Sequence, residues 1–223
     1  SAGDSLETTM AAFGSGAVAR SVRDNATVMN VDVGGGTAKI AICADGRVVD
    51  LTAVDIGARL ICFDADGRIT RLEEAGRRFG RELGLVLDIG VTITEDQVRA
   101  LVDRMADCLF AAMQGGSPQL GGVSLLRLDQ LSHRDEIAAV TFSGGVSEYI
   151  YGRERESFAD LGPLLADAVR QRAQAWGPRV EPPNEGIRAT VIGASQYTTQ
   201  VSGSTIFVSP MEILPLRNVP VIA

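Results

Sequence analysis

The chain has 223 residues, of which 45% are apolar and 22% are charged, a composition typical of a globular protein large enough to bury a core. Its formal net charge of −7 argues against a nucleic-acid or anionic-membrane surface, since either would need basic residues gathered in a stripe. A bound phosphate stays compatible with this charge, because a local group of backbone N–H donors can bind an anion in an acidic protein.

The cysteine and histidine content gives little support to a metal or catalytic-triad site. Cys43, Cys62 and Cys108 are scattered and form no CxxC motif, so we expect reduced thiols with packing roles. His133 is the only histidine, and its polar neighbourhood favours a place on the surface. No apolar run approaches the ~20 residues of a membrane-spanning helix, and we expect the protein in the cytoplasm without membrane contact.

The first half of the chain predicts a helix followed by an antiparallel meander of strands. Alternating apolar residues with Asp-Gly turns at Asp45-Gly46 and Asp66-Gly67 support the meander. The DxDG pattern that begins at Asp64 lacks the glutamate that closes a calcium loop, so a plain turn is expected there. The helix is expected over residues 4–13, and the strands over 28–33, 37–43, 47–57, 58–64 and 68–73.

The second half predicts helices and buried strands in alternation. Thr94 and Gln97 form a capping box before a helix with apolar residues at three- and four-residue spacing, and Pro163 fits the first turn of another helix. The helices are expected over 94–112 and 161–175, and the strands over 137–142, 188–193 and 202–209. This order predicts an α/β domain, with residues 1–27 as a lead-in and 28–223 as its body.

Three segments share one pattern, in which an apolar strand runs into glycine and then into a small hydroxyl residue. They are residues 31–37, 140–148 and 190–198. Glycine has no Cβ, so backbone N–H groups can approach a ligand there and φ can be positive. At the carboxyl ends of buried strands, such segments line the crevice in which α/β sheets bind ligands. Three of them in one domain favour a nucleotide site.

The first segment has the groups that a nucleotide phosphate needs. Gly34, Gly35 and Gly36 would offer N–H donors to the β- and γ-phosphates, and Thr37 would offer its hydroxyl. Asp32, at the end of its strand, would hold Mg²⁺ through water, because Mg²⁺ keeps much of its hydration. Asp32 is therefore the candidate catalytic residue, and this segment is the candidate phosphate site.

The second segment fits the other end of a nucleotide. Gly144 and Gly145, after Ser143, would let a flat adenine or a ribose lie against the backbone. Glu148 could accept a hydrogen bond from a ribose hydroxyl, or it could be a first-turn helix carboxylate stabilised by the helix dipole. The expected contacts from the third segment are Gly193 and Ala194.

These segments resemble motifs of a known ATPase superfamily. DVGGGT at 32–37 resembles the second phosphate motif of the actin, sugar-kinase and heat-shock-chaperone ATPases, residues 140–148 resemble their adenosine motif, and residues 191–198 resemble their second connecting helix. More closely, these segments and LPLRNVP at 214–220 resemble the ethanolamine ammonia-lyase reactivating factors. This closer resemblance spans nearly all of residues 14–223.

The resemblance implies a ribonuclease-H-like lobe of the actin-like ATPase fold, a mixed sheet with an antiparallel meander and flanking helices. It implies ATP and Mg²⁺ as cofactors and ATPase activity in the intact protein. It also implies a chaperone-like function in which damaged cobalamin leaves ethanolamine ammonia-lyase so that adenosylcobalamin can enter. The lyase would be the direct partner and adenosylcobalamin an indirect one. Homo-oligomers and association with a bacterial microcompartment are further implications.

Two features depart from the superfamily pattern. The superfamily binds ATP between two lobes, and no strand–glycine–threonine hairpin precedes residue 28, so we expect one lobe here and poor ATP binding by it alone. Lys39 stands where the motif usually has an acidic or amide residue. It could contact phosphate as a point charge or, as we favour, lie exposed on the hairpin.

Three other hypotheses remain. The chain could be a docking module of the ethanolamine utilization system that needs no nucleotide. It could be a metabolite kinase of the same superfamily, although no candidate catalytic aspartate other than Asp32 is evident. It could also form actin-like filaments, which concentration-dependent polymers would reveal.

Overall fold

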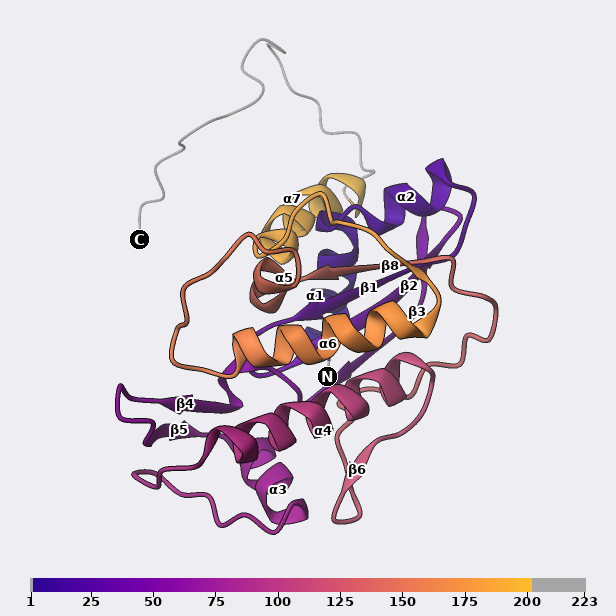
Figure 1. The fold of residues 1–223 in the computed structure, drawn as a ribbon. Helices are drawn as coiled ribbons and strands as arrows, with labels where there is room; N and C mark the ends of the chain where they lie inside the picture. The colour runs from indigo at the N-terminus through magenta and orange to yellow at the C-terminus, as the bar shows by residue number, and fades with distance from the viewer. Residues whose placement is uncertain (1, 202–223) are drawn as a thin grey trace, which may run out of the picture.

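The computed structural model describes residues 2–201, which form a five-stranded mixed sheet with helices on both faces (Figure 1). The strand order is β3-β2-β1-β8-β9. The first three strands form an antiparallel meander, and β8 and β9 continue from β1 in parallel. The strands are β1 (Val28–Val33), β2 (Ala38–Ala44), β3 (Arg47–Val54), β8 (Ala139–Ser143) and β9 (Arg179–Val180). The expected mixed sheet with its meander is confirmed.

Turn chemistry and burial explain the sheet. Asp45 and Gly46 have φ of 51° and 75° and turn β2 into β3, as the Asp-Gly pair predicts. Every residue of β8 is buried, which suits a parallel strand covered on both faces. In the register, Asp32 pairs with Ser143. The carboxyl ends of β1 and β8 therefore lie side by side, and the glycines that follow each strand are neighbours.

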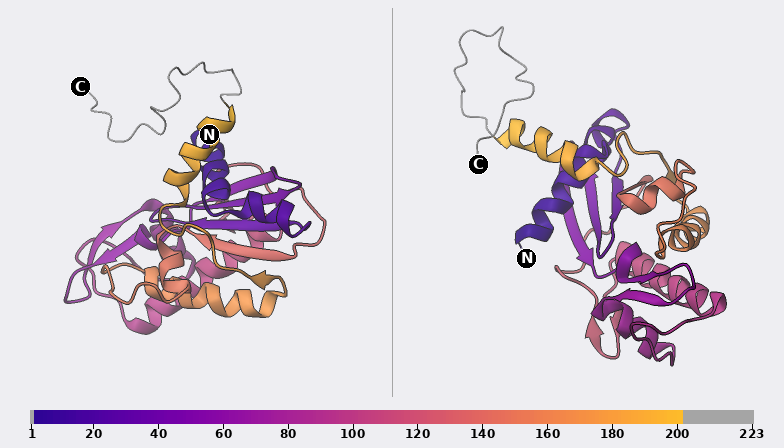
Figure 2. Two further views of the ribbon diagram at one scale, coloured as in Figure 1. Left: turned by 90° about the horizontal axis from the view of Figure 1, so that it is seen from above. Right: turned by 90° about the vertical axis from the view of Figure 1, so that its left-hand side faces the viewer.

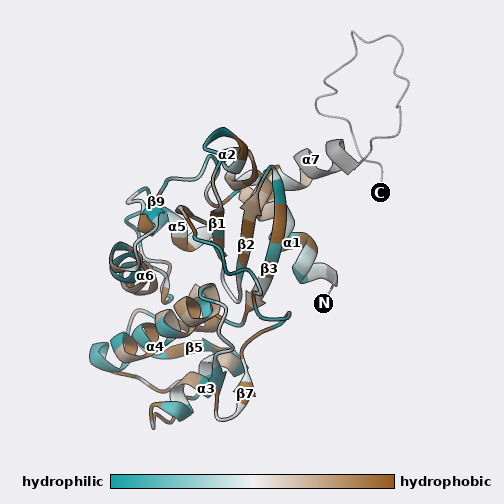
Figure 3. Ribbon diagram, turned by 90° about the vertical axis from the view of Figure 1, so that its right-hand side faces the viewer, coloured by the Kyte–Doolittle hydropathy of each residue, from teal (hydrophilic) through white to brown (hydrophobic). Residues whose placement is uncertain are grey.

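The helices expected over 94–112 and 161–175 are confirmed as α4 (Glu95–Met113) and α6 (Gly162–Trp176), which lie over one face of the sheet. The capping box is confirmed, because Thr94 N donates to Gln97 Oε1 at 2.9 Å and Gln97 N donates to Thr94 Oγ1 at 3.3 Å. Phe110 and Trp176 join the two helices edge to face. Figure 3 shows apolar strands beside an α4 of mixed character, as expected of a helix with only one buried face.

Helices α1 (Ala2–Gly14), α2 (Ala17–Arg23) and α7 (Ala189–Val201) lie at the opposite face (Figures 1 and 2). The helix expected over 4–13 is confirmed by α1. Small buried residues of α1 and α2, including Ala12, Ala17 and Val18, pack against Val28 and Ala41 of the sheet. The lead-in of residues 1–27 thus contributes two helices that cover this face.

The strand expected over 188–193 is wrong, because this segment begins α7. A short apolar run does not distinguish a strand from a buried helix, and here tertiary packing decides. A Cβ on Gly193 would lie 1.7 Å from Met10 O, and a Cβ on Gly14 would lie 1.7 Å from Ala189 O. The two glycines let α1 and α7 pack backbone to backbone. The resemblance of residues 191–198 to a connecting helix agrees with this outcome.

Smaller elements extend the domain at the edges. The segment expected as a strand over 58–64 begins with the 3₁₀ turn η1 (Ala58–Leu60) before β4 (Ile61–Phe63). No helix was expected at α3 (Glu74–Glu82), and α5 (Gly145–Ile150) directly follows the second glycine segment. The other strands are β5 (Ile69–Leu72), β6 (Gln119–Leu120) and β7 (Val123–Ser124). The strand expected over 202–209 and the LPLRNVP motif at 214–220 lie outside the described residues.

A turn is present at Asp64, as the sequence predicts. Asp64 Oδ1 accepts hydrogen bonds from Asp66 N and Arg68 N, both at 2.9 Å. Within residues 2–201, no group of three or more histidine, cysteine, aspartate or glutamate side chains could hold a metal ion. None of the helices in this range is long and apolar enough to cross a membrane.

The cysteines are free and buried, as expected. Burial raises the pKa of the Cys43 thiol to about 12 and that of Cys108 to about 11, so both remain protonated at neutral pH. His133 is not the surface residue that was expected, since its side chain is only 14% exposed. Asp50 of β3 accepts hydrogen bonds from Ser132 N at 2.6 Å and His133 N at 2.8 Å, which fixes this loop against the sheet.

Candidate functional site

The glycine hairpin between β1 and β2 is fixed by hydrogen bonds to η1. Gly34 N donates to Thr37 O at 3.0 Å, while Gly34 O and Gly35 O accept from Ala58 N at 3.0 Å and Arg59 N at 2.6 Å. Among the described hydrogen bonds, none has the N–H of Gly35 or Gly36 as donor. Neither N–H group therefore has a protein acceptor among the described residues.

The first segment does not use glycine for a left-handed backbone. None of Gly34, Gly35 and Gly36 has a φ in that region. The close approach comes from Gly57, where a Cβ would lie 2.4 Å from Gly35 O. A Cβ on Gly36 would meet no atom within 4 Å. The glycines thus leave the hairpin without side chains, so that η1 can pack against its backbone.

The two glycines of the second segment have different roles. Gly144 has a φ of 80°, and a Cβ there would lie 2.5 Å from Val33 O, so only glycine lets the chain cross the end of β1. A Cβ on Gly145 would meet no atom within 4 Å. Packing therefore requires Gly144, whereas Gly145 leaves free space where the two segments meet.

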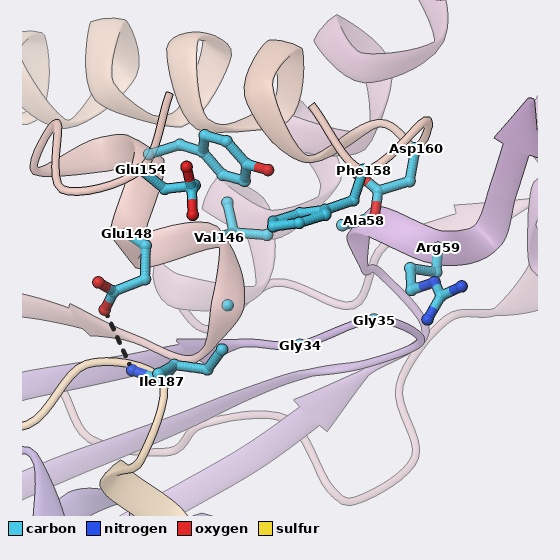
Figure 4. A pocket seen from close by; sticks show the side chains of 12 residues that line it. Gly34, Gly35, Ala58, Arg59, Val146, Glu148, Glu154, Phe158, Asp160 and Ile187 are labelled. Carbon is cyan, nitrogen blue, oxygen red and sulfur yellow. Dashed lines mark hydrogen bonds between the residues drawn. The ribbon is translucent and has the colours of Figure 1, made fainter. Parts of the chain in front are cut away.

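A pocket of about 200 Å³ lies between the two glycine segments (Figure 4). Gly34 and Gly35 of the first segment and Gly145 of the second line it. Its apolar wall consists of Ala58, Val146, Tyr149, Phe158 and Ile187. The rings of Tyr149 and Phe158 meet edge to face with centroids 6.5 Å apart, and Phe158 is 60% exposed. Such a wall suits a flat ring.

The charged side chains of the pocket are mostly acidic. They are Glu148, Glu154, Asp160 and one cation, Arg59. Glu148 lies in the first turn of α5 and also faces the pocket, so neither of its two expected roles excludes the other. Its Oε1 accepts from Ile187 N at 3.2 Å (Figure 4). Sequence reasoning missed Arg59, because it belongs to no motif and its place beside the hairpin depends on η1.

Asp32 belongs to a buried polar network between β1 and β8 and does not line the pocket. Its Oδ2 accepts from Ser143 Oγ at 2.8 Å, and the network continues through Asn30, whose Oδ1 accepts from Thr141 Oγ1 at 3.0 Å. Burial raises the pKa of the Asp32 carboxyl, against the opposing effects of the Ser143 hydrogen bond and the Lys39 charge. The carboxylate thus has a polar partner but an unfavourable environment for its charge.

Lys39 is not exposed, contrary to the alternative that we favoured. Its side chain is 12% exposed, and Nζ forms an ion pair with Glu7 Oε2 of α1 at 2.9 Å. It also donates to Thr37 Oγ1 at 3.1 Å. The reason is that α1 covers this face of the sheet and supplies the counter-ion. Lys39 therefore links α1 to the glycine hairpin.

The structure brings together only part of the predicted site. Gly34, Gly35, Gly145 and Glu148 meet at the pocket. Gly193 contacts the backbone of α1, so its predicted place at the end of a strand is wrong. Besides Asp32, the predicted ligand contacts that do not line the pocket are Gly36, Thr37, Lys39, Ser143, Gly144, Gly193 and Ala194.

Comparison with known proteins identifies the family. The sequence model described as ethanolamine utilisation protein EutA matches residues 1–223. The chain belongs to the EutA family. It is 34% identical over 223 residues to the ethanolamine ammonia-lyase reactivase EutA of Salmonella typhimurium, covering 99% of this chain and 47% of that protein. The same comparison with EutA of Escherichia coli gives 33% identity and the same coverage. This EutA-family chain spans about half the length of these curated relatives.

The solved structures that resemble this chain are less similar to it in sequence than the curated relatives are. MreB5 of Spiroplasma citri bound to AMPPNP has a TM-score of 0.42 and 14% identity, over 88% of this chain and 59% of that one. The activator of the 2-hydroxyisocaproyl-CoA dehydratase from Clostridium difficile, with bound ADPNP, has a TM-score of 0.39 and 11% identity, over 91% and 71%. Because both TM-scores are below 0.5, the fold assignment rests on the strand order of the EutA-family chain itself.

Proposed function

We propose that this chain provides one wall of the nucleotide site of an ATP-dependent reactivating factor, which releases damaged cobalamin from ethanolamine ammonia-lyase. The observation that supports it is the meeting of two bare glycine segments at the carboxyl ends of β1 and β8. The names of the curated relatives support the lyase as partner. In this proposal the protein works in the cytoplasm with the lyase and associates with a bacterial microcompartment.

The pocket residues fit part of a nucleotide. The N–H group of Gly35 suits phosphate oxygens, the aromatic wall suits the base, and Glu148 suits a sugar hydroxyl. Gly36 does not line the pocket, but its N–H group has no protein acceptor among the described residues. The pocket of about 200 Å³ is smaller than the roughly 300–1,000 Å³ of typical ligand sites. The remaining contacts would come from a second wall, as expected for a site between two lobes.

Bound ATP would supply the free energy of phosphoryl transfer to water. The residues of this chain would bind and orient it. The hairpin N–H groups would offset phosphate charge without reorganising, because η1 already fixes the hairpin. Asp32 would hold Mg²⁺ through water, for which its buried carboxyl must be ionised, and Ser143 would orient that carboxyl.

Mg-ATP titration of the intact protein tests the proposal, with and without ethanolamine ammonia-lyase carrying inactivated cobalamin. We expect saturable Mg-ATP binding and recovery of lyase activity only when nucleotide is present. Equal recovery without nucleotide would instead support the docking module. Phosphate transfer to a metabolite would support the kinase.

A Gly145→Val variant tests whether the pocket is the binding site. Space is free at this position and φ is not left-handed, so the new side chain should enter the pocket without disturbing the fold. We expect Mg-ATP affinity to fall at least about tenfold by steric exclusion, with little change in the thermal unfolding midpoint. Unchanged affinity in a folded variant would place the nucleotide elsewhere.

A further inference from the structure

We propose that Arg59 contacts the ligand directly and sets its direction in the pocket, with the anionic group at the Arg59–Gly35 end and the hydroxyl-bearing part at Glu148. The identity of this ligand as a nucleotide rests on the function proposed above. The role of Arg59 as an anion contact rests on the geometry and charge of the pocket alone.

The backbone fixes Arg59 beside the glycine hairpin. Its N–H donates to Gly35 O at 2.6 Å. Its Cδ, Cγ and Cβ lie 3.4, 3.5 and 3.6 Å from the point where a Cβ on Gly35 would be. The aliphatic part of the arginine therefore lies along Gly35, and Figure 4 shows its guanidinium at the edge of the hairpin.

Charge makes this end of the pocket different from the rest. Arg59 is the only cation among the lining residues, and the other charged ones are Glu148, Glu154 and Asp160. Arg153, which does not line the pocket, forms an ion pair with Glu148 Oε1 at 3.8 Å. Within residues 2–201, the side chain of Arg59 forms no ion pair or hydrogen bond, and it is exposed. It can therefore bind an anion without first losing a partner, and a guanidinium matches phosphate oxygens in a bidentate way.

The carboxylates at the pocket are already fixed by backbone donors. Glu154 Oε1 accepts from Glu156 N at 2.8 Å and from Arg155 N at 2.7 Å, and these hydrogen bonds lower the pKa of its carboxyl. Asp160 Oδ1 accepts from Gly162 N at 2.8 Å. Figure 4 shows Asp160 on the Arg59 side of the pocket and Glu148 and Glu154 on the other side. A phosphate close to Glu148 and Glu154 would be repelled, whereas a hydroxyl could donate to Glu148. The two ends of the pocket thus select opposite ends of a ligand.

Calorimetry of the intact protein with adenosine, ATP and inorganic tripolyphosphate tests the inference. In Arg59→Gln, we expect ATP and tripolyphosphate to bind about tenfold more weakly, because a charge-assisted contact is lost. Adenosine should bind as in the wild type. The affinity of Arg59→Lys for ATP and tripolyphosphate should lie between those of the wild type and Arg59→Gln, since lysine keeps the charge but not the forked guanidinium.

Arg47→Gln is the matched control. Arg47 is exposed, has no side-chain partner among the described residues, and lies at the start of β3, by the turn at the opposite end of β2 from the glycine hairpin. The Arg47→Gln variant therefore removes the same charge far from the pocket. We expect all three affinities to change by less than about twofold, because exposed charges beyond a Debye length are screened.

The outcomes separate this inference from the proposed function. Wild-type ATP binding that Arg59→Gln leaves unchanged overturns the inference alone. Equal weakening of adenosine also overturns it, because Arg59 would then shape the pocket without sensing charge. Arg59-dependent tripolyphosphate binding without ATP binding supports the inference and overturns the nucleotide function. A folded wild-type protein that binds neither anion overturns both.

Discussion

At the scale of single residues, Asp32 combines a buried carboxylate with a place beside the glycine hairpin. It is 6% exposed, and Ser143 Oγ is its hydrogen-bond donor. Burial is the largest effect on its pKa, which is raised. The native state therefore binds a proton more readily than the unfolded chain. Stability from this group is present at low pH and is lost as pH rises through the raised pKa.

The raised pKa of Asp32 predicts how the stability of an Asp32→Asn variant depends on pH. The variant removes the buried charge and keeps an oxygen that can accept from Ser143. We expect its free energy of unfolding to exceed that of the wild type at pH 7 and the advantage to vanish below about pH 3.8, the ordinary carboxyl pKa. Denaturant unfolding of both proteins at several pH values measures this difference in the free energy of unfolding.

ATP hydrolysis supplies the second readout for Asp32. If the carboxylate holds Mg²⁺, the same variant, or Asp32→Ala, should hydrolyse ATP more than about tenfold more slowly. A variant that is more stable but less active would show that the charge of Asp32 serves function at a cost in stability. Unchanged turnover would favour the docking hypothesis.

At the scale of elements, the packing of α1 against α7 shows what local patterns can and cannot predict. The capping box and apolar spacing of α4 are local signals, and they predicted the helix closely. Residues 188–193 carry only a short apolar run, and their state depends on α1 at the other end of the described chain. The burial of Lys39 likewise depends on Glu7 of α1.

Gly193→Ala tests this helix packing. In an open helix the change would stabilise by about 1 kcal/mol through propensity. Here the new Cβ would overlap Met10 O, so we expect destabilisation by about 1–3 kcal/mol. Val191→Ala, at a 72% exposed position of the same helix, should change stability by less than about 0.5 kcal/mol. A more stable Gly193→Ala would contradict the close crossing.

At the scale of the whole molecule, the sequence predicted the sheet and the meeting of three glycine segments, of which the structure brings the first two together. Alternation, Asp-Gly turns and a nearly all-apolar strand are short-range signals that survive in the fold. It did not predict which residues share the pocket. Arg59 and Phe158 reach it through η1 and the loop after α5, and no local pattern encodes those positions.

Pocket size leads to a prediction for the whole molecule. Residues 1–223 alone should bind Mg-ATP at least about tenfold more weakly than the intact protein, because a pocket of about 200 Å³ encloses only part of the ligand. Parallel calorimetry of both proteins measures this. Equal, micromolar affinities would show that one wall is sufficient.

The hydrogen bonds from η1 to the glycine hairpin have a consequence for the entropy of binding. Consecutive glycines lose more conformational freedom on ordering than any other residues. Here the carbonyls of Gly34 and Gly35 are held by Ala58 and Arg59. Much of that loss therefore occurs during folding, and a ligand meets donors that are already oriented.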